Sequence, residues 1–271
     1  MNLQSYYKNK VVLVTGSTLG IGKELANLLL SLGAKVIITG RDSKKLEALK
    51  TEFAHWNDNI LYHQGDVTDQ ASNLILIEKI IQRFGKLDVL INNAALSGFG
   101  TVDKMQAEVA KQIIDANIYG SLFPVIAALP ELKKSKGNIL FVSSISGYFG
   151  IPEYSAYTLS KMSLTALTQS LSIELSTSNV SVGIAYVGLT KNESVKKILT
   201  PQGELVFVPE RPKNLTVSRT HTATKILKQI KNKKMSSTHS AVGVFTKIMS
   251  RYFPSITYSV LKMNYNKKSK K

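Results

Sequence analysis

The feature that most constrains the fold of this chain is an apolar strand, a glycine-rich turn and a helix-forming stretch that follow one another near the N-terminus. Residues 10–15 (KVVLVT) are apolar and β-branched, which is typical of a buried parallel strand. The turn contains Gly16, Gly20 and Gly22, and a helical pattern then covers 23–32. Such glycines let a pyrophosphate approach backbone N–H groups at the start of the helix. The order predicts a dinucleotide-binding unit; the alternative is a turn with no ligand.

Strand patterns and helical patterns alternate along the chain. The predicted strands cover 10–15, 35–39, 60–64, 87–91, 137–142 and 180–186, and the predicted helices cover 23–32, 43–53, 69–84, about 103–129 and about 155–175. A helix over 220–231 and a short strand over 235–239 follow. The alternation predicts an α/β protein with a Rossmann-type, doubly wound parallel sheet in three layers. We expect one domain over 8–240 and a basic helical extension over 241–271.

Arg41 follows the second strand and bears on the choice of dinucleotide. In Rossmann-type sites an acidic residue near this point holds the ribose 2′-hydroxyl, whereas an arginine accommodates a 2′-phosphate. Arg41 therefore favours NADP(H) over NAD(H), because a guanidinium suits a phosphate. The alternative is that Arg41 only begins the polar helix over 43–53.

Several polar residues follow the predicted strands directly. They include Asp66 with Val67, Asn93, Ser144 and Thr190. The carboxyl ends of parallel strands meet at one edge of a sheet, so these residues should lie along the same rim as the glycine turn. They are candidates for binding, or for hydrogen bonds to neighbouring loops.

Tyr157 and Lys161 are four residues apart in a predicted helix, so they share one face. A phenol has a pKa of about 10, too high for a proton carrier at neutral pH. An ammonium about 4 Å away would favour the phenolate by up to ~4 kcal/mol and lower that pKa. The pair is a candidate general acid–base centre; the alternative is a surface pair without chemistry.

Taken together, these residues resemble the short-chain dehydrogenase/reductase (SDR) family over roughly residues 8–190. Residues 15–22 (TGSTLGIG) match its TGxxxGIG motif, and 92–94 (NNA) match its NNAG motif, with Ala95 in place of the glycine. Four residues match its catalytic tetrad: Asn117, Ser144, Tyr157 and Lys161. The family pattern departs at Leu19, where NADP-binding members often carry a basic residue.

The resemblance implies an NAD(P)-dependent oxidoreductase acting on C=O or CH–OH groups. It implies that Tyr157 is the general acid or base, that Ser144 hydrogen-bonds the substrate oxygen, and that Lys161 holds the nicotinamide ribose and tunes the tyrosine. Asn117 would position a water of the proton relay. The implied cofactor contacts are Gly16, Thr18, Gly20, Ile21, Gly22, Arg41, Asp66, Val67, Asn93, Tyr157, Lys161 and Thr190. Thr190 fits the pattern least well, because Val187-Gly188 replaces the family's Pro-Gly.

Composition excludes some function classes. The chain has no cysteine, which excludes disulfides, thiolate catalysis and cysteine metal sites, and no metal site is expected. No signal-like segment or apolar run near 18 residues is present, so we expect a cytoplasmic protein without a spanning helix.

The positive charge is concentrated in the last third of the chain. Residues 1–190 carry 17 Lys and Arg against 15 Asp and Glu, whereas residues 191–271 carry 18 against three. The excess consists mainly of lysine (30 Lys, five Arg), and aromatic residues do not alternate with it. We therefore expect no nucleic-acid partner.

The C-terminal extension has apolar residues at helical spacing. Val242, Phe245, Ile248, Met249 and Tyr252 form one stripe, and Ile256, Val260, Leu261 and Met263 form a second beyond Pro254. Four lysines in the last five residues would supply about 4 kcal/mol of attraction to an anionic membrane. We expect peripheral membrane contact; the alternative is that the stripes pack on the body or on a sister subunit.

The function predicted from the sequence is NADP(H)-dependent reduction of a carbonyl, or oxidation of the matching alcohol, on a hydrophobic lipid- or steroid-like substrate. Residues 191–220 are the predicted substrate loop. The alternatives are an NAD-linked alcohol dehydrogenase for a small polar substrate, or a non-catalytic nucleotide-binding sensor or membrane adaptor. The resemblance implies a homodimer or homotetramer formed through the helices near 103–129 and 155–175.

Overall fold

The centre of the molecule is a parallel sheet of seven strands. A computed structural model describes residues 2–191, 196–208 and 215–269. The strands are β1 (Val11–Val14), β2 (Lys35–Gly40), β3 (Ile60–Gln64), β4 (Val89–Asn92), β5 (Asn138–Ser144), β6 (Ser181–Val187) and β9 (Ser236–Thr238). They pair in parallel in the order β3-β2-β1-β4-β5-β6-β9. This confirms the predicted doubly wound sheet.

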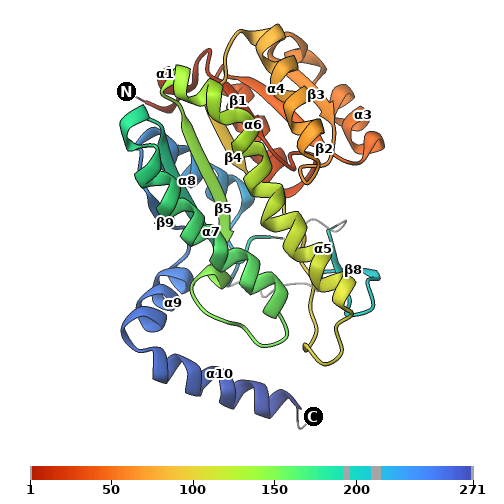
Figure 1. The fold of residues 1–271 in the computed structure, drawn as a ribbon, viewed down its shortest axis with the longest axis vertical. Coiled ribbons are helices and arrows are strands. Elements are labelled where there is room, and N and C mark those ends of the chain that lie inside the picture. Colours follow the sequence, from red (N-terminus) through yellow and green to blue (C-terminus); the bar gives the residue numbers. More distant parts are fainter. Residues whose placement is uncertain (1, 192–195, 209–214, 270–271) are drawn as a thin grey trace.

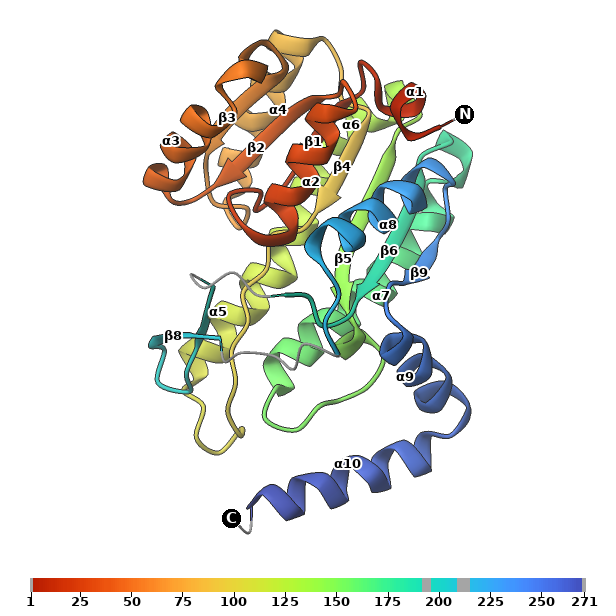
Figure 2. The same cartoon turned by 180° about the vertical axis from the view of Figure 1, so that it is seen from behind.

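Helices cover both faces of the sheet (Figures 1 and 2). One face carries α2 (Gly20–Ser31), α3 (Ser43–Glu52) and α8 (Arg219–Lys231), and the other carries α4 (Gln70–Phe84), α6 (Tyr119–Ser135) and α7 (Ser155–Glu174). Side chains alternate along β1, with Val12 and Val14 in the first core cluster and Val11 and Leu13 in the second. β1 is therefore apolar throughout, because both faces of the sheet are buried there.

The helix predicted over about 103–129 is two helices. α5 spans Ala107–Asn117 and α6 begins at Tyr119, and Ile118 between them keeps a right-handed α conformation (φ −90°, ψ −63°). Within the described residues, Ala107–Ser135 is also the one stretch long and apolar enough to cross a membrane. Its most apolar window is 44% buried, since α6 packs on the sheet.

The remaining elements lie at the two ends of the sheet. At the amino edge, α1 (Leu3–Tyr7) packs on the body, and the buried Tyr7 donates its hydroxyl to the carbonyl of Leu227 at 2.9 Å. Three short 3-10 helices are η1 (Ala54–Asn59), η2 (Ile145–Gly147) and η3 (Ser176–Ser178). At the carboxyl edge lie the hairpin β7 (Lys197–Leu199) and β8 (Leu205–Phe207), and then α9 (Ala241–Tyr252) and α10 (Pro254–Ser269). Both views place α10 beyond the carboxyl ends of the central strands.

Candidate active site

The turn between β1 and α2 requires glycine at two positions. Gly16 has φ +59°, and a Cβ there would lie 2.7 Å from the Cα of Ala94. A Cβ on Gly22 would lie 2.4 Å from the carbonyl oxygen of Gly16. Gly20 has φ +64° with open space beside it, and α2 begins there without a side-chain cap. The turn therefore leaves space and N–H donors at the start of α2, which fits a pyrophosphate.

Asn93 holds this turn from the end of β4. Its side-chain nitrogen donates to the carbonyl oxygens of Thr15 and Gly16, each at 3.0 Å. Its backbone N–H donates to the Thr15 hydroxyl, also at 3.0 Å. Thr18 contacts the end of β2, since a Cβ on Gly40 would lie 2.6 Å from the Thr18 methyl group. Asn93 therefore fixes the backbone of the turn.

Arg41 and Asp66 meet at the carboxyl ends of β2 and β3. Arg41 Nη1 lies 3.4 Å from Asp66 Oδ2, and the two side chains are 62% and 36% exposed. Thr68 donates its N–H and its hydroxyl to Asp66 Oδ1, at 2.9 and 2.8 Å. Burial alone would raise the pKa of Asp66, but these hydrogen bonds and the Arg41 charge hold the pKa below its usual value. Asp66 is thus a charged, oriented carboxylate at the edge where an adenosine binds in such folds.

Two neighbours of this pair are engaged in structural contacts. Asp42 caps α3, because its carboxylate accepts from the N–H of Lys45 at 3.2 Å. The carbonyl of Val67 accepts from the side chain of Asn73 at 2.9 Å. Arg41 is 62% exposed beyond β2, whereas the Asp42 carboxylate, 46% exposed, caps a helix.

Asn117 lies at the junction of α5 and α6 and is fully buried. Its Oδ1 accepts from the N–H of Leu96 at 2.7 Å, and its Nδ2 donates to the carbonyl of Leu96 and to the hydroxyl of Ser160, each at 2.8 Å. Ser160 in turn donates to the carbonyl of Tyr157 at 2.7 Å. These hydrogen bonds connect the loop after β4 to the first turns of α7.

Tyr157 and Lys161 share the inner face of α7. Lys161 is 3% exposed, and its ammonium lies 5.8 Å from the centre of the Tyr157 ring. The ammonium donates to the carbonyl of Val142 at 3.1 Å. Burial, together with the charge of Lys196, lowers the pKa of Lys161 to about 8. The lowered pKa means that Lys161 holds its proton less strongly than an ordinary lysine does, and it lies beside the half-buried phenol of Tyr157. A pair of this kind is suited to general acid–base chemistry.

Ser144 ends β5 and caps η2. Its hydroxyl accepts from the N–H of Ser146 and donates to the Ser146 hydroxyl, both at 3.2 Å. Helix α9 packs on the same turn, since a Cβ on Gly243 would lie 2.9 Å from the Ile145 side chain. The C-terminal helices thus attach beside Ser144.

The predicted substrate loop contains the hairpin β7–β8, and its residues 192–195 and 209–214 lie outside the described part of the chain. The N–H of Leu199 donates to the carbonyl of Ser97 at 2.9 Å, and Phe99 returns an N–H to Leu199 at 3.1 Å. These bonds hold the hairpin on the loop that follows β4. One apolar cluster results, and it contains Val109, Ile113, Ala156 and Leu199 with Leu96, Met105, Ala110 and Tyr157 packed against them.

Thr190 lies just beyond β6 and is 8% exposed. It pairs in parallel with Val217, whose carbonyl accepts from the N–H of Lys191 at 3.0 Å. The position is at the carboxyl edge of the sheet, as the sequence predicts.

A family model for short chain dehydrogenases matches residues 10–203. The chain belongs to the short-chain dehydrogenase family. Members of this family are oxidoreductases, which confirms the enzyme class implied by the motifs.

Relatives and solved structures place this short-chain dehydrogenase among diverse members. It is 32% identical over 205 residues to mouse dehydrogenase/reductase SDR family member 7B. The aligned residues make up 74% of this chain and 64% of the mouse protein. A Burkholderia cenocepacia short chain dehydrogenase in complex with NADP has a TM-score of 0.79 at 21% identity, over 94% of this chain and 98% of its own. A Burkholderia phymatum short chain dehydrogenase/reductase in complex with NAD has a TM-score of 0.79 at 18% identity, over 93% of this chain and 96% of its own. Structural neighbours thus hold either dinucleotide.

The structure of this short-chain dehydrogenase groups the predicted residues into three sets at one edge. Gly16, Thr18, Gly20 and Gly22 lie with Asn93, Arg41 lies with Asp66 and Val67, and Asn117 lies with Tyr157 and Lys161. Ile21 packs on the first core cluster, and Ser144 and Thr190 lie at the ends of β5 and β6.

Three contributors were missed from the sequence. Thr15 accepts the N–H groups of Asn93 and Ala94, Ser160 links Asn117 to Tyr157, and Lys196 acts on Lys161. The role of Ser160 could have been predicted from the sequence, because it lies three residues after Tyr157 and one before Lys161. The effect of Lys196 could not, since its position depends on how the hairpin folds back.

Proposed function

We propose that this short-chain dehydrogenase uses NADP(H) to reduce a carbonyl, or to oxidise the matching alcohol, on a hydrophobic lipid- or steroid-like substrate. The observation that supports it most is the buried Lys161 ammonium 5.8 Å from the Tyr157 ring, at the edge that also carries the glycine turn. The bound nicotinamide would supply or accept the hydride. A small polar substrate for an NAD-linked dehydrogenase is the alternative.

Within this proposal each side chain has a distinct part in moving or holding the proton. Tyr157 exchanges its hydroxyl proton with the substrate oxygen, and Ser144 donates a hydrogen bond to that oxygen. Lys161 stabilises the phenolate and lowers the barrier to proton transfer. Asn117, through Ser160, fixes the turn of α7 that carries Tyr157.

The test of this reaction is Tyr157→Phe with Tyr154→Phe as a matched control. We expect kcat for a ketone panel to fall by about 10²–10⁴-fold in Tyr157→Phe, because a positioned proton carrier contributes that much. NADPH binding should stay within a few-fold of the wild type. Undiminished turnover in Tyr157→Phe would refute the mechanism, and no turnover in the wild type on any substrate would favour a nucleotide-binding sensor or adaptor.

The preference for NADP(H) rests on the end of β2. Arg41 is exposed and next to Asp66, whereas the Asp42 carboxylate is engaged in capping α3. Arg41→Ala should raise KM for NADPH about tenfold, since charge-assisted hydrogen bonds contribute about 1.5–3 kcal/mol, while KM for NADH stays nearly constant. Equal changes for both dinucleotides would reject the preference.

The hydrophobic substrate class rests on the apolar cluster around Tyr157. The β7–β8 hairpin brings Leu199 against the loop that follows β4, so apolar side chains surround one side of the tyrosine. We expect kcat/KM to rise with substrate chain length, because about 0.8 kcal/mol is gained for each buried methylene. A panel of steroids, 3-keto lipids, retinoids and sugars would check this, and a preference for sugars would reject it.

We further propose that the C-terminal arm, residues 241–271, is a unit distinct from the 8–240 domain and contacts anionic membranes peripherally, in an otherwise cytoplasmic protein. The arm carries seven Lys and Arg and no acidic residue. Phe245 is 64% and Tyr252 68% exposed on α9. The protein should co-sediment with phosphatidylserine vesicles and not with neutral ones, and removal of 240–271 should abolish this. Equal co-sedimentation after truncation would contradict the proposal.

We also propose a homodimer or homotetramer formed through α6 and α7. Tyr119 and Ile126 on α6 and Ile173 on α7 are large apolar side chains that are 45%, 48% and 75% exposed. Light scattering after gel filtration measures the oligomeric state, and Ile173→Glu should lower the molar mass. A monomer in the wild type would contradict it.

A further inference from the structure

The first helix of the C-terminal arm, α9, has its apolar side chains on the side away from the body. Phe245, Ile248 and Tyr252 follow helical spacing and are all exposed. Gly243, the buried residue of α9, falls on the opposite side of the helix. A helix that packs on its own chain does the reverse and buries its apolar stripe. The stripe of α9 is therefore an uncovered surface of the kind that marks interaction sites.

The second helix of the arm, α10, has the same orientation. Ile256, Val260 and Met263 are exposed and share one side of the helix by their spacing. Leu261 and Tyr265 are partly buried and share the other side. Both helices of the arm therefore present an apolar stripe away from the body.

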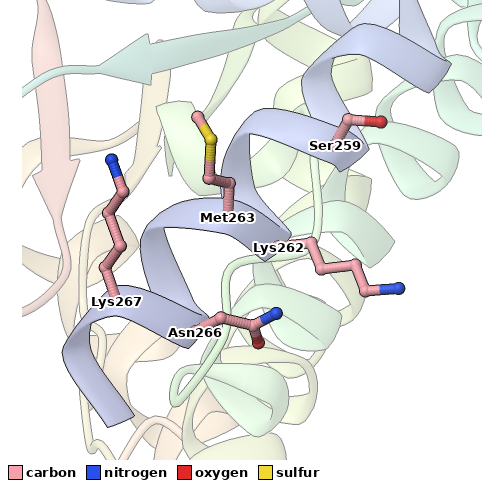
Figure 3. Close-up of a pocket in the computed structure, with 5 residues that line it drawn as sticks. All are labelled: Ser259, Lys262, Met263, Asn266 and Lys267. Atoms are coloured by element: carbon pink, nitrogen blue, oxygen red, sulfur yellow. The ribbon is translucent and has the colours of Figure 1, made fainter. Parts of the chain in front are cut away.

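Basic side chains accompany the exposed stripe of α10. Figure 3 shows Lys267 extending to the same side of this helix as Met263. The arm has seven Lys and Arg and no acidic residue to neutralise them. Apolar stripes flanked by lysines are typical of helices that lie in the interface of an anionic bilayer. Charge complementarity therefore favours anionic lipid as the partner of the arm.

Helix α10 lies beside the loops that surround the predicted active site. It faces residues 149–152, in the loop between β5 and α7, across a cavity of about 510 Å³. The carbonyl of Glu153 in that loop accepts from the N–H of Gly100 at 2.7 Å, and the N–H of Gln106 donates to the carbonyl of Pro201 in the β7–β8 turn at 3.0 Å. Both views show α10 and the loop before α5 at the same end of the molecule. The arm, the two loops and the hairpin thus form one continuous edge.

Two further large apolar side chains are exposed on this edge. Val102, 73% exposed, lies on the loop after β4, and Leu205, 56% exposed, begins β8 directly after the hairpin turn. Met105 and Leu199, from the same two segments, pack in the cluster that includes Tyr157. Apolar side chains therefore extend from the outer edge to the predicted reaction centre.

This edge differs from the surface proposed for subunit contact. Helices α6 and α7 cover one face of the sheet, whereas α10 and the loops lie beyond the ends of its strands. Ile173 lies in the last turn of α7, at the opposite end of that helix from the loop that contains Glu153. An oligomer formed through α6 and α7 is therefore compatible with a second contact at this edge.

We propose that the arm and these loops dock together on an anionic bilayer, so that the carboxyl edge of the sheet faces the lipid and the substrate enters the site from it. The stripes of α9 and α10 enter the interface beside Val102 and Leu205, and the lysines of the arm lie at the lipid phosphates. The inference rests on the proposed membrane contact of the arm and on the proposed hydrophobic substrate. It adds the orientation of the enzyme on the membrane and the route of the substrate.

The test of the orientation uses single cysteines, since the chain has none of its own. Met263→Cys, Val102→Cys and Leu205→Cys in the full chain are each labelled with the polarity-sensitive fluorophore NBD. Thr177→Cys is the control, because Thr177 lies in η3 between α7 and β6, at the amino edge of the sheet. With phosphatidylserine vesicles we expect a blue shift and stronger emission at the three test positions, and loss of the added emission when the vesicles contain doxyl-labelled lipid. The control should not respond, and neutral phosphatidylcholine vesicles should change none of the four.

A substitution in the loop after β4 tests the route of the substrate. Val102→Glu should weaken vesicle affinity about tenfold, because it removes apolar area from the interface and adds a charge that anionic lipid repels. It should lower kcat/KM for a long-chain ketone dissolved in the vesicles by a similar factor and leave turnover of a short water-soluble ketone nearly constant. Met235→Glu is the matched control and should leave all three unchanged, because Met235 is an exposed apolar residue directly before β9, at the amino end of that strand.

Three results would overturn the proposal. A response at Met263 without one at Val102 and Leu205 would mean that the arm binds lipid while the active-site edge faces away from it. No response at any position would remove the membrane contact of the arm as well. Emission that changes with protein concentration in the absence of vesicles would show that a second copy covers this edge. None of these readouts needs turnover, so a failure of the proposed reaction is recognised separately, as absence of activity on every ketone.

Discussion

The body and the C-terminal arm of this short-chain dehydrogenase use apolar residues in opposite ways. Residues 1–190 are nearly neutral in charge, and their apolar patterns end in two core clusters on the faces of one sheet. In α9 only Gly243 is buried, and in α10 Thr257, Leu261 and Tyr265 are at most partly covered. Of 22 large apolar side chains exposed in the described residues, ten belong to the arm: Val242, Val244, Phe245, Ile248, Tyr252, Phe253, Ile256, Tyr258, Val260 and Met263.

The difference shows that helical periodicity alone does not decide where a helix packs. In the body each apolar stripe meets a complementary surface of the same chain. In the arm most of the apolar side chains are exposed. The arm also carries seven basic residues and no acidic residue. Exposed apolar patches of this kind mark interaction sites, and the predictions below separate the two regions on that basis.

The largest effect is expected at Gly22, where the body leaves no room. Gly22→Ala places a Cβ 2.4 Å from the Gly16 carbonyl and 2.5 Å from the Asn93 side chain, so the turn must move. We expect the affinity for NADPH, measured by fluorescence titration, to fall more than about 100-fold, and the free energy of unfolding to fall by about 1–3 kcal/mol. Gly150→Ala is the control, because nothing lies within 4 Å of its Cβ position. Normal NADPH binding by Gly22→Ala would show that the turn does not shape the site.

The second prediction compares two asparagines. Asn117→Ala removes three buried hydrogen bonds and leaves the backbone groups of Leu96 without partners. Its free energy of unfolding in urea should fall by about 2–4 kcal/mol, and kcat should fall as well, because α7 loses its link to the loop after β4. Asn264→Ala, on the exposed α10, should stay within about 0.5 kcal/mol of the wild type. Similar losses at both positions would remove the distinction between body and arm.

The predictability of the fold from the sequence follows the same division. Residues 11–14 and 89–91 are apolar throughout because both faces of the sheet are covered, and the sequence carries that information locally. The boundary at Ile118 was missed, and so were the contacts of the adjacent Asn117 with Leu96 and Ser160, which are distant in the sequence.

The site divides in a similar manner. The glycines and the Tyr157–Lys161 pair form motifs whose spacing determines their geometry, and they were predicted. The influence of Lys196 on Lys161 was not, because it depends on the path of the β7–β8 hairpin over the loop that follows β4. Charge interactions across loops leave no periodic pattern in a sequence.

The third prediction uses the buried charge of Lys161. Burial lowers its pKa from 10.5 to about 8, so between these pH values the unfolded chain binds a proton that the folded chain does not. The free energy of unfolding should therefore rise from pH 8 to pH 10, on the order of 2–3 kcal/mol relative to Lys161→Met. Lys262→Met, in the arm, should follow the wild type. If the free energy of unfolding of the wild type and of Lys161→Met changed in parallel with pH, burial would not lower the pKa of Lys161.

The fourth prediction concerns Lys196, whose charge is the second cause of the lowered Lys161 pKa. Lys196→Gln should raise that pKa, so the Lys161 titration in kcat/KM should move to higher pH by less than about one unit. Lys225→Gln on α8 provides a control for net charge. An unchanged pH profile in Lys196→Gln would show that the hairpin does not act on Lys161.

The smallest effect is expected from removing α10. Deletion of residues 254–271 takes away a helix in which three positions of 254–267 are partly buried, so little apolar area returns to water. The free energy of unfolding should change by less than about 1 kcal/mol, and turnover of a short water-soluble ketone should be retained. A loss of more than about 2 kcal/mol in the free energy of unfolding would mean that α10 belongs to the folded body. The region that differs from the body would then end with α9, at Tyr252.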